Sequence, residues 1–323
     1  MLKPNFGIKE KDRLRLEASV TVIIHAAADI SLKASLRSSV ATNCLPSLEL
    51  ARLSSNFVRL QCFVQVSSLY ALSFLPDGEV EERLYHISDP EGALRSILAG
   101  DDVDFDAYAW AYARAKHITE CLLTARNPKL PLLILRPSSI GPALFEPFEL
   151  YGKQQSIPID AFYSRLMTPA QSPHTFLATR GSTSGTNILD EIPVDLVANV
   201  LLQHVEMGTR GPVHANCRFY TVKSFDDFVR DVNTWVPNYW KLKLSPVAFT
   251  TDEDAELCQI ARFYGMATRN WIFMSSRSDR LLQHGTLGVS LEGHNAEAYT
   301  KARIQRVLRD MERWRNKRIS PKI

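Results

Sequence analysis

The chain has 323 residues, which allows one large domain or one domain with a smaller partner. Hydrophobic residues make up 45% and charged residues 23%, which excludes a disordered, collagenous or disulfide-stapled protein. The formal net charge of +3 is too small to indicate a nucleic-acid binder. The five cysteines are widely spaced without a Cys-x-x-Cys, so we expect no metal site and no disulfide framework, and a reducing compartment.

The sequence contains no run of 18 apolar residues, so we expect no transmembrane segment. Residues 1–7 do not pair a charged region with an apolar one, as a signal peptide would. We therefore expect an intracellular protein that is cytoplasmic or peripheral to an organelle membrane.

Strand and helix patterns alternate in the first half of the chain. Residues 20–28 begin as a β-branched apolar run, which is typical of a buried parallel strand, and residues 38–53 then have helical spacing. Residues 63–66 predict a second strand, residues 106–125 a helix, and residues 130–135 a third strand. The alternation predicts an α/β fold, a doubly wound, Rossmann-like parallel sheet.

The second half is less regular. Residues 168–188 are rich in Ser, Thr, Pro and Gly and predict a loop or lid, whereas a strong helical pattern covers 192–205. Residues 252–315 have mainly helical character. We therefore expect a reductase-like sheet domain over residues 1–245 and a smaller, mainly helical domain over residues 246–323.

The last 23 residues form a basic amphipathic segment, with nine Lys or Arg against two acids. The simpler interpretation is a terminal helix packed on the body of the protein. The alternative is docking on an anionic membrane surface or an acidic carrier protein. The apolar row consists of Ile304, Val307, Leu308, Met311 and Trp314.

Tyr112 and Lys116 are the strongest candidates for chemistry. Their i,i+4 spacing on a predicted helix places both side chains on one face. An ammonium group near a phenol is expected to lower the pKa of the phenol and make it a usable acid or base. Ser67 and Ser68 end a predicted strand upstream, at the sheet edge where open α/β folds bind ligands.

Small or polar residues also follow the other predicted strands. His25, Ala26 and Ala27 follow the first strand, where small side chains would let a flat cofactor approach the backbone. Asn43 lies in the next predicted helix. The strand over residues 130–135 leads into the segment Arg136-Pro137-Ser138.

These pieces, in this order, resemble the extended short-chain dehydrogenases/reductases, and in finer detail the fatty acyl-CoA reductases of the male-sterility type. The resemblance covers nearly the whole chain. It rests on Pro4–Ile8, His25–Ala28, Val66–Ser68, Tyr112-x-x-x-Lys116, Arg136–Gly141, Glu146–Phe148, Ile192–Asp195 and the segment Asn270–Leu281.

The resemblance implies a catalytic set of Ser68, Tyr112 and Lys116. Tyr112 would donate a proton to the developing alkoxide, Lys116 would lower the pKa of Tyr112 and hold the nicotinamide ribose, and Ser68 would bond the carbonyl. Ser67 is the nearby alternative to Ser68. The residues that would line the cofactor, NADPH, are Ala26, Ala27, Asn43, Lys116, Pro137 and Ser138.

The implied reaction is NADPH-dependent reduction of a long-chain acyl thioester, presented by CoA or a carrier protein, to a fatty alcohol through the aldehyde. Two alternatives remain within the enzymes: a carrier-bound thioester reductase, or an extended dehydrogenase acting on a sugar nucleotide or steroid. A third is a non-catalytic remnant that binds a partner through an exposed sheet edge.

One departure from the family concerns the cofactor's phosphates. The family begins with a strand, a Gly-rich turn and a helix that cradle the pyrophosphate, but this sequence contains no Gly-x-Gly. We therefore expect the sheet to lack its first strands, about 60–100 residues of the family pattern. We also expect this chain to bind NADPH poorly or not at all.

Several other residues have a simple structural interpretation. His25 is expected to be structural or cofactor-lining, and His117 to lie on the helix surface. Asp195 is expected to cap a helix. Glu146–Phe148 is expected to mark a turn and Trp271–Phe273 an alternating strand.

Overall fold

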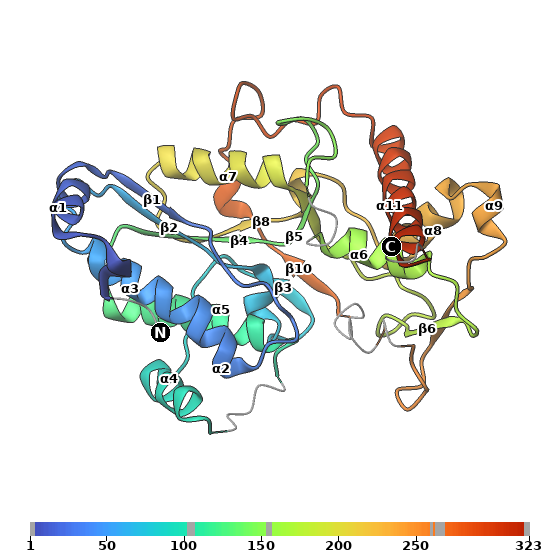
Figure 1. The fold of residues 1–323 in the computed structure, drawn as a ribbon, viewed down its shortest axis with the longest axis horizontal. Helices are drawn as coiled ribbons and strands as arrows, with labels where there is room; N and C mark the ends of the chain where they lie inside the picture. The colour runs from blue at the N-terminus through green and yellow to red at the C-terminus, as the bar shows by residue number, and fades with distance from the viewer. Residues whose placement is uncertain (1–3, 102–106, 153–156, 259–260, 262–268, 320–323) are drawn as a thin grey trace. The chain divides into compact units, whose positions relative to one another are not determined.

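The computed structural model describes residues 4–101, 107–152, 157–258, 261 and 269–319 (Figure 1). The chain divides into two compact units, and each draws on three separate stretches of sequence. Unit 1 comprises Met1–Ser138, Val200–Ala215 and Phe273–Leu287. Unit 2 comprises Ser139–Asn199, Asn216–Ile272 and Gly288–Ile323.

Unit 1 is built around a parallel sheet in the order β1-β2-β4-β8. Because all four strands run the same way, their carboxyl ends meet at one edge. The parallel α/β fold expected from the sequence is thereby confirmed. The strands are β1 (Val22–His25), β2 (Cys62–Val66), β4 (Leu132–Pro137) and β8 (Gly211–Ala215).

The strand register brings the ends of β1, β2 and β4 into line. His25 lies opposite Gln65, and Val66 lies opposite Leu135. In a parallel pair, opposed residues point to the same face of the sheet. The residues that follow these strands are therefore neighbours at the carboxyl edge.

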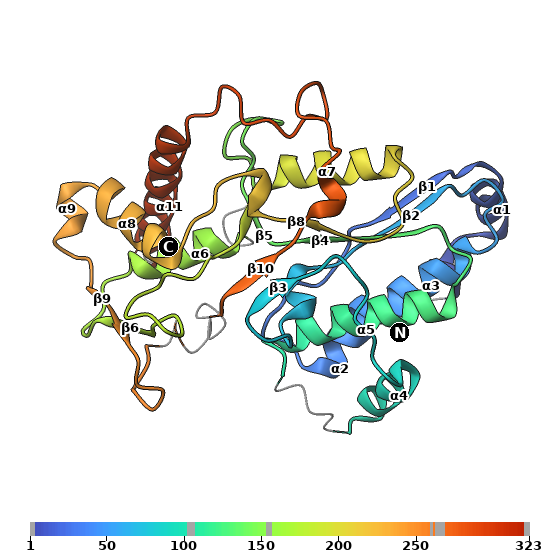
Figure 2. The same cartoon turned by 180° about the vertical axis from the view of Figure 1, so that it is seen from behind.

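Helices cover both faces of this sheet (Figures 1 and 2). Helices α3 and α5 lie on one face and α7 on the other. On the first face, Phe63 and Ile134 of the sheet pack in a core with Leu48, Ile118 and other apolar side chains of the helices. The smaller elements and helices of unit 1 are η1 (Pro4–Gly7), α1 (Glu10–Ser19), α2 (Leu36–Ser39), η2 (Val40–Cys44), α3 (Leu45–Ser54), η3 (Leu69–Leu72), β3 (Gly78–Val80), α4 (Pro90–Ala99), α5 (Ala111–Arg126) and η7 (Ser276–Ser278).

Helix α5 begins later than the sequence pattern predicts. It starts after Trp110, which has an extended backbone and makes no side-chain cap. Residue 106, where the sequence pattern places the start of this helix, lies outside the described residues. Helix α4 was not predicted, although Asp89 caps it by accepting a hydrogen bond from the Gly92 N–H.

Unit 2 contains two short parallel strand pairs, β5–β7 and β6–β9. Strand β6 lies within residues 168–188, where the sequence predicted a loop or lid. The elements are β5 (Ser139–Gly141), α6 (Pro158–Leu166), β6 (His174–Leu177), β7 (Glu191–Pro193), η5 (Cys217–Phe219), α8 (Phe225–Trp235), α9 (Asn238–Lys241), β9 (Val247–Thr250) and α11 (Ala296–Ile319), while α7 (Val194–Glu206) and β10 (Trp271–Phe273) run across the boundary of the units.

The apolar row of the basic helix α11 is internal. Ile304, Val307 and Leu308 are at most 2% exposed and pack in the core of unit 2. The interpretation of this row as a membrane-docking face is therefore wrong, and the packing interpretation holds. Trp314, at 56% exposed, lies outside that core.

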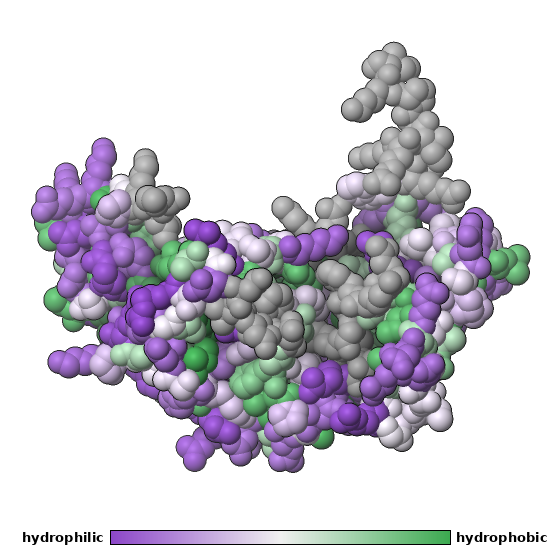
Figure 3. Space-filling view, turned by 90° about the horizontal axis from the view of Figure 1, so that it is seen from below, coloured by the Kyte–Doolittle hydropathy of each residue, from purple (hydrophilic) through white to green (hydrophobic). Residues whose placement is uncertain are grey.

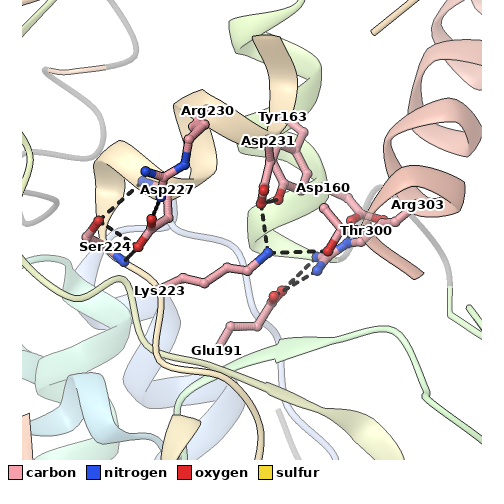
Figure 4. A network of polar contacts seen from close by, with 10 residues as sticks. All are labelled: Asp160, Tyr163, Glu191, Lys223, Ser224, Asp227, Arg230, Asp231, Thr300 and Arg303. Atoms are coloured by element: carbon pink, nitrogen blue, oxygen red, sulfur yellow. Dashed lines mark hydrogen bonds and ion pairs between the residues drawn. The ribbon is translucent and has the colours of Figure 1, made fainter. Parts of the chain in front are cut away.

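A buried polar network ties α11 to α6 and β7 (Figure 4). The Arg303 guanidinium donates to Asp160 at 2.6 Å and to both carboxylate oxygens of Glu191 at 2.7 Å. Lys223 donates to Asp231 at 2.7 Å in the same network. Arg303 is only 4% exposed, so these carboxylates neutralise a charge that water does not reach.

The five cysteines are free thiols, and Cys44, Cys62, Cys121 and Cys217 are buried. Burial raises the pKa of the Cys44 and Cys121 thiols to about 11. They are therefore protonated and unreactive in the folded protein.

In the view of Figure 3, the hydrophilic and hydrophobic side chains of the described residues are interspersed. Among the helices that the structure describes, none is long and apolar enough to cross a membrane.

Candidate functional site

The structure brings Lys116 and Tyr112 of α5 to the carboxyl end of β2 in unit 1. The Lys116 Nζ donates to the main-chain oxygen of Val66 at 2.9 Å, directly before Ser67 and Ser68. The same Nζ lies 5.6 Å from the centre of the Tyr112 ring. Tyr112 and Lys116 are thus neighbours, as the i,i+4 spacing predicted, and Lys116 lies at the strand end that leads into the two serines.

The charges at this site differ from the expectation that Lys116 lowers the pKa of Tyr112. Burial raises the pKa of Tyr112 to about 12, and burial lowers the pKa of Lys116 to about 8 while Glu120 opposes that shift. Desolvation causes both pKa shifts. The ammonium group donates to a main-chain oxygen and lies 5.6 Å from the phenol ring. Tyr112 is therefore a protonated phenol at neutral pH, which is the form a proton donor needs.

The two serines have different partners. The Ser67 hydroxyl donates to the Glu120 carboxylate at 2.5 Å and is 3% exposed. The Ser68 hydroxyl accepts a hydrogen bond from the Tyr70 N–H at 3.2 Å, which leaves its own proton available. This geometry favours Ser68 over Ser67 as the donor to a bound carbonyl.

A buried ion pair underlies this site and was not predicted. Glu120 and Arg136 are both 0% exposed, and the guanidinium contacts both carboxylate oxygens, at 2.6 and 3.0 Å. Arg136 also reaches the Arg83 main-chain oxygen at 3.0 Å. The sequence indicates only that Glu120 lies on the helix face of Tyr112 and Lys116, because it continues their i,i+4 series; nothing in the spacing indicates Arg136 as its partner.

His117 is also buried, which corrects the expectation that it lies on the helix surface. It is 2% exposed, contacts the Tyr108 hydroxyl at 2.7 Å and the Tyr85 main-chain oxygen at 2.6 Å, and stacks on Phe74 at 4.7 Å. Burial lowers its pKa. His117 therefore joins α5 to Phe74, Tyr85 and Tyr108. None of these contacts involves Tyr112 or Lys116.

The expected cofactor-lining residues take three different positions. Ala26 and Ala27 follow β1 and are exposed. Pro137 ends β4 and Ser138 is 5% exposed. Asn43 acts within the scaffold: its amide accepts from the Asp29 N–H at 2.8 Å and donates to the Asp29 oxygen at 2.9 Å.

Three polar atoms at this sheet edge are buried and lack a hydrogen-bond partner among the residues that the structure describes: His25 Nε2, Gln65 Oε1 and Ser138 Oγ. A buried polar atom without a partner is costly, so the presence of such atoms in β1, in β2 and directly after β4 points to a polar ligand. The amide and hydroxyl groups of a nicotinamide riboside would satisfy such atoms. The residues present therefore fit the nicotinamide end of the cofactor.

The sequence predicts Asp195, in unit 2, as a helix cap, but in the structure its main partners lie outside its helix. Its carboxylate accepts hydrogen bonds from the N–H groups of Leu144, Phe145 and Glu146, the Phe145 bond being 2.8 Å long. Asp195 therefore holds the turn that leads into Glu146–Phe148, whose Phe148 ring is 61% exposed.

Among the described residues, no three His, Cys, Asp or Glu side chains are grouped so that they could hold a metal ion. The arrangement suits proton donation to an oxygen beside a polar organic ligand.

Comparisons with known proteins agree with this geometry. The NAD-binding family model described as "Male sterility protein" matches residues 1–201. The "Putative fatty acyl-CoA reductase CG8306" of Drosophila melanogaster is 27% identical over 285 residues, covering 76% of this chain and 53% of the relative. "Fatty acyl-CoA reductase 1" of Gallus gallus is 25% identical over 211 residues, covering 62% of this chain and 39% of the relative. The chain thus spans about half the length, or less, of these relatives.

Solved structures share the fold. The terminal R domain from the myxalamid PKS-NRPS pathway has a TM-score of 0.61 at 16% identity, covering 96% of this chain and 73% of the other. UDP-glucuronic acid 4-epimerase from Bacillus cereus, solved with NAD, has a TM-score of 0.57 at 14% identity, covering 94% and 79%.

Proposed function

The chain belongs to the male sterility family of NAD-binding proteins, and on that premise we propose that it supplies the reductase site of a fatty acyl-thioester reductase. The observation that supports the proposal is that Lys116 donates to the main-chain oxygen of Val66, two positions before Ser68, and lies 5.6 Å from the Tyr112 ring. The substrate is a long-chain acyl thioester, and NADPH is the reductant.

Ser68 and Tyr112 act on the carbonyl oxygen of the substrate. Ser68 donates a hydrogen bond to it, and Tyr112 transfers its proton as negative charge develops there. The high pKa of Tyr112, about 12, keeps that proton in place until an alkoxide forms. The first hydride and proton would convert the thioester to a thiohemiacetal, which expels the CoA or carrier thiol to leave the aldehyde. A second hydride and proton would give the alcohol.

Lys116 and the residues at the ends of β1, β2 and β4 bind and orient the cofactor. Bound NADPH supplies the hydride equivalent for each round. Lys116 would hold the ribose hydroxyls, and Ser138 and His25 would satisfy their unpaired polar atoms on the nicotinamide end. Ala26 and Ala27 leave room at the edge because they carry only methyl side chains.

The test is consumption of NADPH by the purified chain, measured with hexadecanoyl-CoA, with the same acyl group on a carrier protein, and with free hexadecanal. Lipid products are identified by mass spectrometry, and NADH replaces NADPH in a parallel series. Tyr112→Phe should lower turnover about 10²–10⁴-fold, the usual contribution of a positioned acid.

Tyr239→Phe is the matched control, because Tyr239 is 56% exposed on α9. Turnover unchanged by Tyr112→Phe would contradict the assignment. NADPH binding without turnover of any acyl substrate would favour the alternative of a non-catalytic binding protein.

A further inference from the structure

We propose that Glu120 is a positioning residue for the reductase site: its carboxylate joins the helix that carries Tyr112 and Lys116 to the ends of β2 and β4. This inference rests on the proposed function for its catalytic meaning, but its geometry and its main test do not depend on turnover.

The first step of the argument is the set of contacts that Glu120 makes. One carboxylate oxygen accepts from both the Ser67 hydroxyl and the Arg136 Nε, at 2.5 and 3.0 Å, and the other accepts from the Arg136 Nη2 at 2.6 Å. Ser67 directly follows β2, and Arg136 lies in β4. One side chain therefore connects α5 to two strands, next to the residues that would touch substrate.

The second step concerns the choice between the serines. Because Glu120 binds the Ser67 hydroxyl, that hydroxyl points into the protein and its proton is used. The Ser68 hydroxyl does not share this partner, because it accepts from the Tyr70 N–H. Glu120 thereby fixes which hydroxyl is free to meet a carbonyl.

The third step concerns the charge on Lys116. Glu120 lies one helical turn from Lys116 and raises the pKa of that lysine against the effect of burial. Two further titratable groups among the described residues lie near Lys116, His25 of β1 and Tyr112 of α5. Those that face Glu120 are Arg136 from β4 and His117 and Cys121 from α5.

A purely structural role is a poor explanation for this pair. Apolar side chains of similar volume stabilise a core at least as well as a buried ion pair, which has to be stripped of water. An ion pair instead fixes one geometry, because a bidentate guanidinium–carboxylate contact is strongly directional. That property suits a helix whose position sets a reactive phenol.

The direct test is the titration of Lys116, followed by NMR on the full chain with ¹³Cε-labelled lysine. The Lys116 signal is assigned by its loss in Lys116→Arg. Glu120→Gln keeps the shape of the side chain and removes its charge, so the midpoint of the Lys116 titration should fall by about one pH unit. Glu91→Gln is the matched control. Glu91 of α4 pairs at 2.6 Å with Arg126 of α5, the helix that carries Lys116, but its side chain is partly exposed.

Glu120→Gln leaves Arg136 buried without its partner and could prevent folding. The double variant Glu120→Gln/Arg136→Met removes both charges and permits the same titration. An unchanged Lys116 midpoint in whichever variant folds would overturn the proposal.

The second test compares Ser67→Ala with Ser68→Ala in the NADPH assay. Ser68→Ala should lower turnover about 100-fold, the cost of losing one donor to a developing oxyanion, and Ser67→Ala by less than about tenfold. Equal losses would overturn the serine assignment. If no variant and no wild-type chain turns over substrate, the proposed function fails while the Lys116 titration still decides the role of Glu120.

Discussion

The ammonium group of Lys116 lies 2.9 Å from the main-chain oxygen of Val66, buried between α5 and the end of β2. This places a charge with few partners at 4% exposure, and burial lowers its pKa to about 8. Burying this lysine therefore lowers the stability of the fold, which is common where a side chain binds a ligand.

The first prediction is that Lys116→Met stabilises the folded chain while abolishing reduction. The unfolded lysine binds a proton up to about pH 10.5 and the folded one only to about pH 8, so wild-type stability rises with pH between these values. At pH 7 the variant should be more stable by about 1–3 kcal/mol. Urea denaturation at pH 7 and pH 10 measures the difference.

Lys129→Met serves as its control, because Lys129 is exposed. A wild-type chain whose stability does not rise from pH 8 to pH 10 relative to Lys116→Met would refute the prediction.

The second prediction concerns the turn that Asp195 holds. Asp195→Ala removes the acceptor of three main-chain N–H groups, so the variant should lose about 2–4 kcal/mol of stability. Hydrogen exchange at Leu144, Phe145 and Glu146 should become faster. Glu206→Ala, an exposed position on the same helix, should leave both quantities unchanged. Equal exchange rates in Asp195→Ala and wild type would show that the turn holds itself.

The third prediction is a loss of stability in acid caused by His214. Burial, followed by the charge of Arg136, lowers its pKa to about 3. The unfolded histidine takes up a proton near pH 6.5, so unfolding becomes more favourable as the pH falls from about 6.5 to 3. His214→Gln should flatten this dependence by an amount on the order of 2–4 kcal/mol. His86→Gln, at an exposed histidine, should not.

Denaturation midpoints at pH 7, 5.5 and 4.5 provide the measurement. A His214→Gln profile parallel to that of wild type would rule His214 out as the cause.

The fourth prediction concerns the network around Arg303. Arg303→Met leaves Asp160 and Glu191 buried without their shared cation, so it should cost about 3–5 kcal/mol. The triple variant with Asp160→Asn and Glu191→Gln should recover much of that loss, because both buried carboxylates are then neutral and only Arg306, whose side chain is 17% exposed, loses its partner. Arg313→Met, at a residue whose side chain is 75% exposed, is the control. A triple variant no more stable than Arg303→Met would mean that packing dominates the network.

The sequence was sufficient to predict β1, β2 and β4 and most of α5, because short apolar runs are typical of parallel strands, whereas β8 was not predicted individually. Val22–His25 and Leu132–Pro137 begin with such runs. It also placed Tyr112 beside Lys116, since helical spacing alone sets that contact.

Long-range polar contacts were not predictable in the same way. Glu120 and Arg136 look like surface residues in a one-dimensional pattern, and only the packing of α5 on β4 buries both. The pKa of Tyr112 was misjudged for a related reason: spacing indicates the neighbour, whereas desolvation depends on the complete surroundings. Asp195 likewise serves a turn about 50 positions earlier, which no local rule reveals.

The buried thiols can report how often each unit of the fold opens locally. Cys44, Cys62 and Cys121 belong to unit 1, whereas Cys217 belongs to unit 2. A disulfide reagent can modify each thiol only while its surroundings are open, so the rate of modification at each position reports the opening of that unit. Mass spectrometry of time-resolved labelling would then rank the two units by the frequency of their local opening, without any introduced probe.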